Sequence, residues 1–135
     1  MSVETKTWQG LETFAFGDSS RMADELGALV VAGTKTATCW ATVHGEQTYV
    51  GKQMVMLDGQ GRGWAIIETV ELSQRRFDEV DATFARDEGE GDRTLEYWRE
   101  DHRGYFTREG TFAPDMILYC ERFRLVRVLD RETAL

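Results

Sequence analysis

The stretch KQMVMLDGQGRGWAIIETVEL, residues 52–72, contains two apolar runs on either side of the turn residues DGQG. Asp-Gly between two such runs is the strongest short-range indication of a β-hairpin. The stretch therefore predicts two antiparallel strands, near 53–57 and 63–72. The other expected elements lie before and after this hairpin in the chain.

The residues before the hairpin predict one helix followed by one strand. Apolar residues recur at helical spacing at Met22, Leu26, Leu29 and Val30. Ser19 can cap the start of this helix and Gly33 can end it in a left-handed conformation, so we expect a helix over 20–32. The following TATCWATV is rich in threonine, β-branched and aromatic residues, and it predicts a strand that begins near Thr36.

The residues after the hairpin predict two helices and a long strand. A short helix is expected over 81–86, and DEGEGD (87–92) breaks it with two glycines and a cluster of like charges. A second helix begins at Thr94, and MILYCERFRLVRVL (116–129) predicts the strand. Helices packed on a small, partly open, barrel-like sheet make an α+β fold. No repeat or break in composition divides the chain, so we expect one domain over 1–135.

The composition limits the partners. The formal net charge is −8, and binding to a duplex draws its affinity from lysine and arginine that displace condensed counterions. Duplex DNA is therefore not an expected partner, whereas a local cleft can still take a nucleoside or a few nucleotides. The sequence has no run of about 18 apolar residues, and MSVETKTWQG is not typical of a signal peptide. We expect no membrane partner and a cytoplasmic location.

The cysteines and histidines give no indication of a metal site. Cys39 and Cys120 are far apart in the sequence and form no Cys-x-x-Cys pair, and His44 and His102 have no ligand spacing between them. We therefore expect reduced, buried thiols, no metal and no cofactor.

The turn between the first helix and its strand is one candidate site. Lys35 and Thr38 follow Gly33 in AGTKTATCW, residues 32–40. Gly33 is explained by the end of the helix, and Lys35 and Thr38 are common residue types in such a turn. In a tight turn, however, a lysine ammonium and a hydroxyl three residues later can converge on one small volume. Both interpretations stay open on local pattern alone.

The acidic segment DEGEGD is a second candidate site. Glu88 and Glu90 lie beside glycines, where the backbone can approach a neighbour closely, just before the start of a helix. A hydrolase requires such a carboxylate opposite its nucleophile. The alternative is a solvated acidic loop in which Asp92 or Thr94 caps the next helix.

Together the two segments resemble a known family. GTKTAT (33–38) matches the Gly-x-Lys-x-x-Thr motif of the ASCH family, the activating-signal-cointegrator homology domain. FARDEGEGDRTLEYWREDH resembles the segment after the hairpin in a bacterial single-domain subgroup, and DMILYCERFRLV resembles the closing strand. The resemblance covers about 14–128. It implies a PUA-like fold, a partly open β-barrel with helices over one opening, and a cleft lined by the Lys/Thr turn. RNA binding is proposed for the family, and members similar to enzymes include an amidohydrolase that deacylates N4-acetylcytidine and a ribonuclease.

The resemblance also implies catalytic residues. The amidohydrolase site consists of a lysine, a threonine nucleophile and a glutamate, which correspond here to Lys35, Thr38 and Glu90, with Glu88 as the alternative glutamate. A neutral lysine could activate the threonine, but a nearby carboxylate holds lysine protonated. We therefore expect Lys35 to stay charged and to stabilise an oxyanion or a phosphate, and Glu90 to carry the proton. The family motif ends in arginine, where this chain has Trp40, a residue with a stacking face and one N–H donor.

These observations lead to one hypothesis and two alternatives. The chain is expected to bind RNA or a nucleoside-type ligand in a cleft around Lys35 and Thr38. Further ligand-binding residues are expected at Gly33, Trp40, Glu88, Arg122 and Arg124. The first alternative is an amidohydrolase acting on a modified nucleoside such as N4-acetylcytidine, with a ribonuclease as a weaker one. The second is an interaction or regulatory module.

Overall fold

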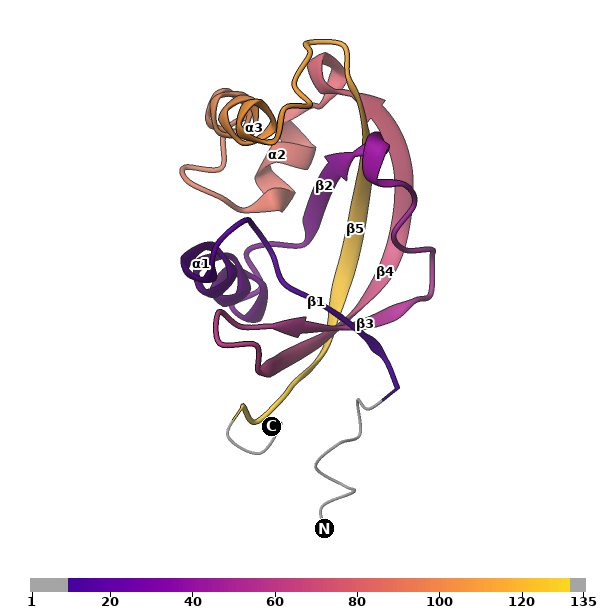
Figure 1. Cartoon of the computed structure of the whole chain (residues 1–135), viewed down its shortest axis with the longest axis vertical. Coiled ribbons are helices and arrows are strands. Elements are labelled where there is room, and N and C mark those ends of the chain that lie inside the picture. The colour runs from indigo at the N-terminus through magenta and orange to yellow at the C-terminus, as the bar shows by residue number, and fades with distance from the viewer. Residues whose placement is uncertain (1–9, 132–135) are drawn as a thin grey trace.

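The computed structural model describes residues 10–131 and consists of one five-stranded sheet with three α-helices on one side of it (Figure 1). The elements in chain order are β1 (Glu12–Phe14), α1 (Ser20–Val31), β2 (Ala37–Ala41), β3 (Gln53–Leu57), β4 (Gly63–Arg76), α2 (Ala82–Glu88), α3 (Leu95–Glu109) and β5 (Ile117–Val128). Two short 3-10 helices span Thr42–His44 and Phe77–Glu79. The α+β class and the partly open, barrel-like sheet are as predicted.

The strand order is β1-β3-β4-β5-β2, and the predicted hairpin, β3 and β4, lies at its centre. All pairs are antiparallel except β1 with β3. β4 continues to Arg76 rather than to residue 72, because its last residues pair with β5 down to Ile117. β1 was not predicted; it is three residues long and pairs with β3 at the edge of the sheet.

The helix ends show why local sequence placed most elements correctly. The Ser19 side chain accepts a hydrogen bond from Met22 N at 3.1 Å, and Thr94 does the same for Tyr97 N at 3.1 Å. Gly33 follows α1 with φ +83°. One prediction was wrong: residues 87 and 88 do not break the short helix, which ends only where Gly89 takes φ +78°. Glu88 therefore belongs to the last turn of α2 rather than to a loop.

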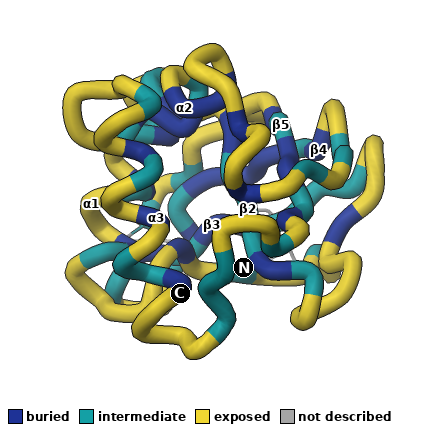
Figure 2. Tube along the Cα trace, turned by 90° about the horizontal axis from the view of Figure 1, so that it is seen from above, coloured by how far each residue is buried: buried dark blue, intermediate teal, exposed yellow. Residues whose placement is uncertain are grey.

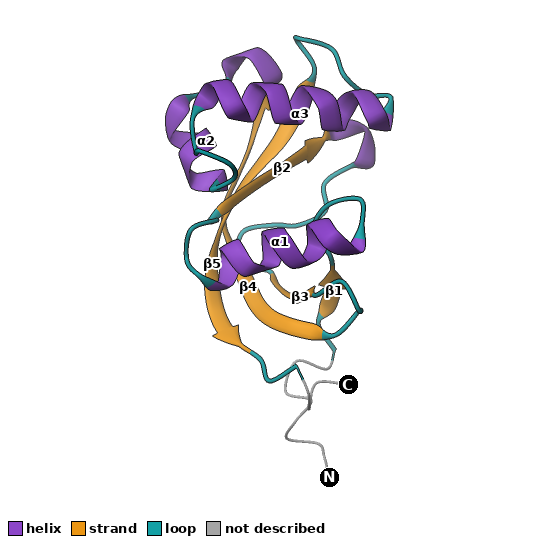
Figure 3. Ribbon diagram, turned by 90° about the vertical axis from the view of Figure 1, so that its left-hand side faces the viewer, coloured by secondary structure: helices purple, strands orange, loops and turns teal. Residues whose placement is uncertain are grey.

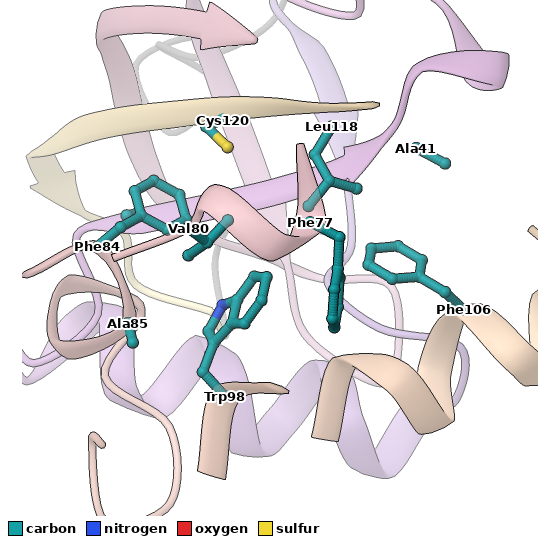
Figure 4. Packing of buried hydrophobic residues seen from close by; sticks show 10 residues of the cluster. Ala41, Phe77, Val80, Phe84, Ala85, Trp98, Phe106, Leu118 and Cys120 are labelled. Atoms are coloured by element: carbon teal, nitrogen blue, oxygen red, sulfur yellow. The ribbon is translucent and has the colours of Figure 1, made fainter. Parts of the chain in front are cut away.

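Two hydrophobic clusters hold the helices to the sheet. Figure 3 shows the three helices lying in front of the strands, with α2 and α3 above α1. The α2/α3 core contains the aromatic residues Phe77, Trp98 and Phe106, which pack over β2 and β5 (Figure 4). The α1 core lies around Phe16, Val30 and other side chains of the hairpin and β5. Figure 2, coloured by the burial of each residue, shows buried residues in the strands and in parts of the helices. Within residues 10–131, no helix is both long and apolar enough to cross a membrane.

Candidate functional site

A cleft of about 290 Å³ lies between the sheet and the helices and is lined by residues of both cores. One wall comes from the Lys35 turn, the end of α2 and the inner face of α3. The other wall comes from β2, β5 and the segments around residues 14–17 and 47–48. The two walls meet at Lys35, whose Nζ donates to Ala37 O of β2 and lies 5.3 Å from the centre of the Phe16 ring. Its polar side chains are Lys35, Thr38, His44, Gln47, Thr48, Glu88, Glu90, Asp101, His102, Arg108, Glu109 and Glu121.

The Lys35 turn and the end of α2 are joined through the backbone. Thr36 N donates to Asp87 O at 2.7 Å, and Lys35 N donates to Leu29 O at 3.1 Å. The two segments approach so closely that a Cβ at Gly89 would lie 2.5 Å from Thr34 O. Gly89 is therefore required twice, for its positive φ and for this close approach. Glycine at 89 is what places both glutamates beside Lys35.

Lys35 is 1% exposed, and its ammonium uses every proton that it has. The Nζ atom donates to Ala37 O, Glu88 Oε1 and Glu90 Oε2, each at 2.8 Å. An ammonium has three N–H donors and no acceptor. In this geometry no donor is left for a bound molecule unless one of the three partners moves.

Glu88 is as deeply buried as Lys35, and its second oxygen has partners of its own. Oε2 accepts from Trp98 Nε1 at 3.0 Å and lies 3.5 Å from His102 Nε2. His102 Nδ1 faces Trp98 O at 2.9 Å. Both ring nitrogens of His102 thus face acceptors, and only the doubly protonated imidazolium can donate to both.

The pKa values of these groups agree with this protonation. Burial alone lowers the pKa of Lys35, but the Glu88 and Glu90 carboxylates outweigh it and raise that pKa. Burial alone raises the pKa of Glu88, and Lys35 followed by His102 outweighs it and holds the pKa well below its usual range. His102 is likewise disfavoured by burial, yet Glu88 and then Glu90 raise its pKa.

Glu90 differs from Glu88 in its access to the cleft. Its side chain is 14% exposed, against 1% for Glu88. Burial raises the pKa of Glu90; Lys35 opposes this shift and the Glu88 carboxylate adds to it. Sequence reasoning left open which glutamate faces the cleft; both bind Lys35, and Glu90 is the more exposed. We call Lys35, Glu88, Glu90 and His102 the lysine cluster; with two cations and two carboxylates its charges balance.

Thr38 lies on the other wall. It pairs with Glu121 across β2 and β5, so the two side chains stand on the same face of the sheet. Among residues 10–131 the Thr38 hydroxyl makes no hydrogen bond to the protein. Glu121 Oε2 accepts from Thr69 Oγ1 at 2.6 Å, and Thr69 Oγ1 lies 2.7 Å from Thr48 Oγ1. We call Thr38, Thr48, Thr69 and Glu121 the Glu121 wall.

Trp40 lines the cleft, but its polar atom is already used. The indole Nε1 donates to Gly45 O at 2.9 Å, and the ring packs 5.6 Å from that of Tyr119. The expected N–H donor to a ligand is therefore bound within the protein, and the part of the indole on the cleft can act only through its surface.

Three of the residues expected to bind a ligand do not line this cleft. Gly33 follows α1 at an open position, with nothing near its Cα hydrogens. Arg122 pairs with Glu71 at 3.0 Å and with Asp87 at 3.2 Å. Arg124 pairs with Glu68 at 2.9 Å. Arg122 also lies 5.3 Å from the Phe84 ring of α2, so both arginines serve ion pairs outside the cleft.

Sequence reasoning missed several members of the site. His102 and Trp98 lie on the buried face of α3, and nothing in their sequence spacing indicated their contacts with Glu88. Glu121 was not singled out, although its position as the acidic residue beside buried Cys120 in an apolar strand was a signal. Cys39 and Cys120, distant in the sequence, are directly opposed across β2 and β5, and both are free thiols.

The donor atoms of Cys39, Glu88 and His102 lie within 4.8 Å of one another, a spacing that a metal ion could use. The protonation of these groups does not fit a metal. Burial, with the Glu88 carboxylate adding to it, raises the pKa of Cys39 and keeps it a thiol, whereas a metal requires the thiolate. Lys35 and Trp98 also occupy the oxygens of Glu88. The cluster is better described as an ion-pair network.

Comparisons with known proteins agree with this architecture. A family model described as the ASCH domain matches residues 12–127. The structure is similar to an ASCH domain from Lactobacillus crispatus JV V101, with TM-score 0.81 and 32% identity over 92% of this chain and 83% of that one. A DUF984 protein from Enterococcus faecalis V583 is similar at TM-score 0.78 and 38% identity, over 87% and 77% of the two chains. An ASCH protein from Zymomonas mobilis shares the fold at TM-score 0.55 and 11% identity, over 91% and 73%. Among curated proteins none matches.

Proposed function

This chain belongs to the ASCH domain family, and from that premise we propose that it binds a small nucleoside-type ligand in the cleft around Lys35 and Thr38. The observation that carries the proposal is the unpartnered Thr38 hydroxyl, which stands in a cleft whose other wall presents Lys35 and Glu90. The volume of about 290 Å³ is near the lower end of small-molecule pockets. Polar groups that converge beside apolar and aromatic side chains are typical of such sites.

The apolar part of the cleft suits a nucleobase. Aromatic rings line it at Phe14, Phe16, Trp40 and Tyr105. Stacking of a base on an aromatic side chain contributes about 1–3 kcal/mol in proteins that bind single strands. A base placed between these rings would have its polar edge within reach of both walls.

The charge of the cleft favours an uncharged nucleoside over an RNA backbone. Five carboxylates line the cleft, at Glu88, Glu90, Asp101, Glu109 and Glu121. The permanently charged cations are Lys35, whose protons are all bound, and Arg108, which lies 3.5 Å from Asp18. A polyanion needs unpaired cations to neutralise its phosphates, and this cleft offers none.

The test is isothermal titration calorimetry of cytidine, uridine, adenosine and inosine against the wild type and two matched variants. Thr38→Val removes the free hydroxyl while keeping the side-chain shape, and we expect about tenfold weaker binding because one hydrogen bond is lost. Thr36→Val, two residues earlier and outside the cleft, serves as the control and should bind as the wild type does. Binding that is equal in both variants would remove Thr38 from the site.

A parallel titration with single-stranded RNA separates the two kinds of ligand. We expect weak binding that disappears as salt is raised. RNA binding tighter than that of every nucleoside, with a steep dependence on salt, would contradict the proposal and favour an RNA-binding surface instead.

Hydrolysis is the second candidate, and the observation that favours it is that the free Thr38 hydroxyl and the partly exposed Glu90, with its raised pKa, line the same cleft. In this mechanism the Thr38 oxygen attacks an acyl carbonyl as its proton passes to the Glu90 carboxylate. The amine then leaves with that proton, and water hydrolyses the acyl-threonine, with Glu90 accepting and returning a proton. Lys35 acts through its positive charge, since its donors are occupied, and offers a direct contact only when Glu90 is protonated and releases it.

Chromatography of N4-acetylcytidine incubated with purified protein tests this candidate. Conversion to cytidine by the wild type and by Thr36→Val, but not by Thr38→Val, would support a covalent step. Conversion that persists in Thr38→Val would contradict Thr38 as the nucleophile, and an inert wild type would leave only the binding proposal.

A further inference from the structure

Glu121 is a buried carboxyl group that forms no salt bridge with the described residues. It is 6% exposed, and it lines the cleft. Glu88, by contrast, has Lys35 and His102 beside it. A buried charge without a salt bridge is unfavourable, and burial accordingly raises the pKa of Glu121. The hydrogen bond from Thr69 and the charges of Lys35 and Lys52, which lie beyond salt-bridge distance, oppose this shift. The group is poorly satisfied by the protein itself.

The hydroxyls beside Glu121 have a fixed direction. Each threonine hydroxyl has one proton, and Thr69 donates its proton to Glu121 Oε2. Thr48 must therefore supply the proton in its 2.7 Å contact with Thr69. The row of hydrogen bonds from Thr48 to Thr69 to Glu121 holds Oε2 in place and so orients the carboxyl group. In the described residues Oε1 has no hydrogen-bond partner.

The free hydroxyl of Thr38 stands beside this carboxyl group. Thr38 and Glu121 are a directly opposed pair in β2 and β5, so they present a hydroxyl and an unsatisfied carboxyl oxygen to the same part of the cleft. A ligand that offers an N–H to Oε1 satisfies the carboxyl group. A ligand that offers a carbonyl oxygen at the same position faces a negative or partly negative oxygen.

We propose that Glu121 selects nucleobases whose hydrogen-bonding edge has an exocyclic amine next to a ring nitrogen, as in cytosine and adenine. This inference rests on the proposed nucleoside binding and names its class of ligand. A carboxyl group and such an edge fit with one shared proton: either the acid donates to the ring nitrogen and accepts from the amine, or the carboxylate accepts from both. The edge of uracil or hypoxanthine has an oxygen in place of the amine. An ionised Glu121 repels this oxygen, and the neutral acid donates to it more weakly than to the more basic ring nitrogen of cytosine or adenine.

The experiment compares two matched pairs by calorimetry: cytidine with uridine, and adenosine with inosine. In each pair the sugar is constant and only the base edge exchanges an amine for an oxygen. For the wild type we expect the amino member of at least one pair to bind about tenfold tighter or more, as one charge-assisted hydrogen bond would provide. Glu121→Gln should lower this preference to less than about threefold, because an amide can turn to match either edge.

Two further variants distinguish recognition from a general effect on the fold. Glu71→Gln removes an exposed carboxylate of β4 outside the cleft and should keep the wild-type preference. Thr69→Val removes the hydroxyl that orients Glu121 and should lower the preference in part. Thermal melting of each variant establishes that it is folded before it is titrated.

The outcomes separate this inference from the proposal on which it rests. If the wild type binds nucleosides but does not distinguish amine from oxygen, or if Glu121→Gln weakens both members of a pair equally, the role of Glu121 is wrong and nucleoside binding stands. If the preference for the amino member persists in Glu121→Gln, the role of Glu121 is likewise wrong and nucleoside binding stands. If no nucleoside binds the wild type, the proposed function fails and this inference fails with it.

Discussion

The two walls of the cleft treat buried charge in opposite ways. The lysine cluster places two cations between two carboxylates, and the protons of Lys35 and His102 all face acceptors. The Glu121 wall keeps one carboxyl group that accepts a hydrogen bond from the Thr69 hydroxyl and, among the described residues, forms no salt bridge. A charge whose partners lie within the protein is tied to the stability of the fold, whereas a group left unsatisfied is available to a ligand. We therefore expect the lysine cluster mainly to stabilise the cleft and the Glu121 wall mainly to recognise the ligand.

Lys35→Met gives the largest effect expected from this comparison. Removing the ammonium leaves the fully buried Glu88 and the mostly buried Glu90 without their shared cation, and breaking a buried ion pair in this way costs about 3–5 kcal/mol. Urea unfolding should show a loss of this size in the free energy of unfolding. Lys52→Met breaks a pair with Glu12, whose side chain is 67% exposed, and should cost under about 1 kcal/mol. Equal losses in the two variants would contradict the structural role of the lysine cluster.

Single substitutions of Glu88 and Glu90 compare the two carboxylates of the lysine cluster, with expected losses of stability of intermediate size. Glu88→Gln removes a charge that Lys35, Trp98 and His102 all contact, so we expect a loss of about 2–3 kcal/mol. Glu90→Gln removes a carboxylate that pairs with Lys35 and whose side chain is 14% exposed, so we expect a loss of about 1 kcal/mol or less. The same urea titration measures both. A larger loss for Glu90→Gln would mean that Glu90, rather than Glu88, holds the helices to the Lys35 turn.

The pH dependence of stability gives the smallest effect, and it concerns His102. Its pKa is raised in the folded protein, so its contribution is fully present below the unfolded value of about 6.5 and is lost as pH rises through the folded value. Glu88, Glu90 and Asp101 all face this ring, and the raised pKa of Glu90 adds a slope of the same sign. The difference between the wild type and His102→Gln isolates the histidine.

The measurement is the urea midpoint at several pH values from 6 upward. The wild type should lose up to about 1.4 kcal/mol per pH unit more than His102→Gln within the window between the two pKa values. The control is His44→Gln, at an exposed position, which should follow the wild type. Parallel curves for the wild type and His102→Gln would show that His102 is not an imidazolium in the folded protein.

Much of the fold could be predicted from local sequence because its signals are local. The DGQG turn set the β3–β4 hairpin, and Ser19 with Gly33 set α1 to within about one residue. The extension of β4 to Arg76 and the edge strand β1 were not predictable, because each exists only through pairing with a strand elsewhere in the chain. The end of α2 was predicted too early. The prediction relied on the glycines and like charges of residues 87–92 together, whereas Gly89 is where the helix ends.

The candidate site divides in the same way. The sequence and the family motif named Lys35, Thr38, Glu88, Glu90 and Trp40, which all line the cleft. Arg122 and Arg124 were named for their charge, but their partners Glu71, Asp87 and Glu68 come from other segments. Glu121 was missed because a strand pattern says nothing of which buried acid lacks a salt bridge.

By itself the sequence determined which segments are helix or strand, where the turns fall, and which two motifs carry the family resemblance, since these depend on neighbours a few residues apart. Only the tertiary structure decided that Lys35 meets Glu88 and Glu90, which lie 53 and 55 residues later, and that Glu121 accepts from the Thr69 hydroxyl. The physical reason is that the partners of a buried charge are chosen by packing across the chain. No local pattern records how many of its hydrogen bonds are left unmade.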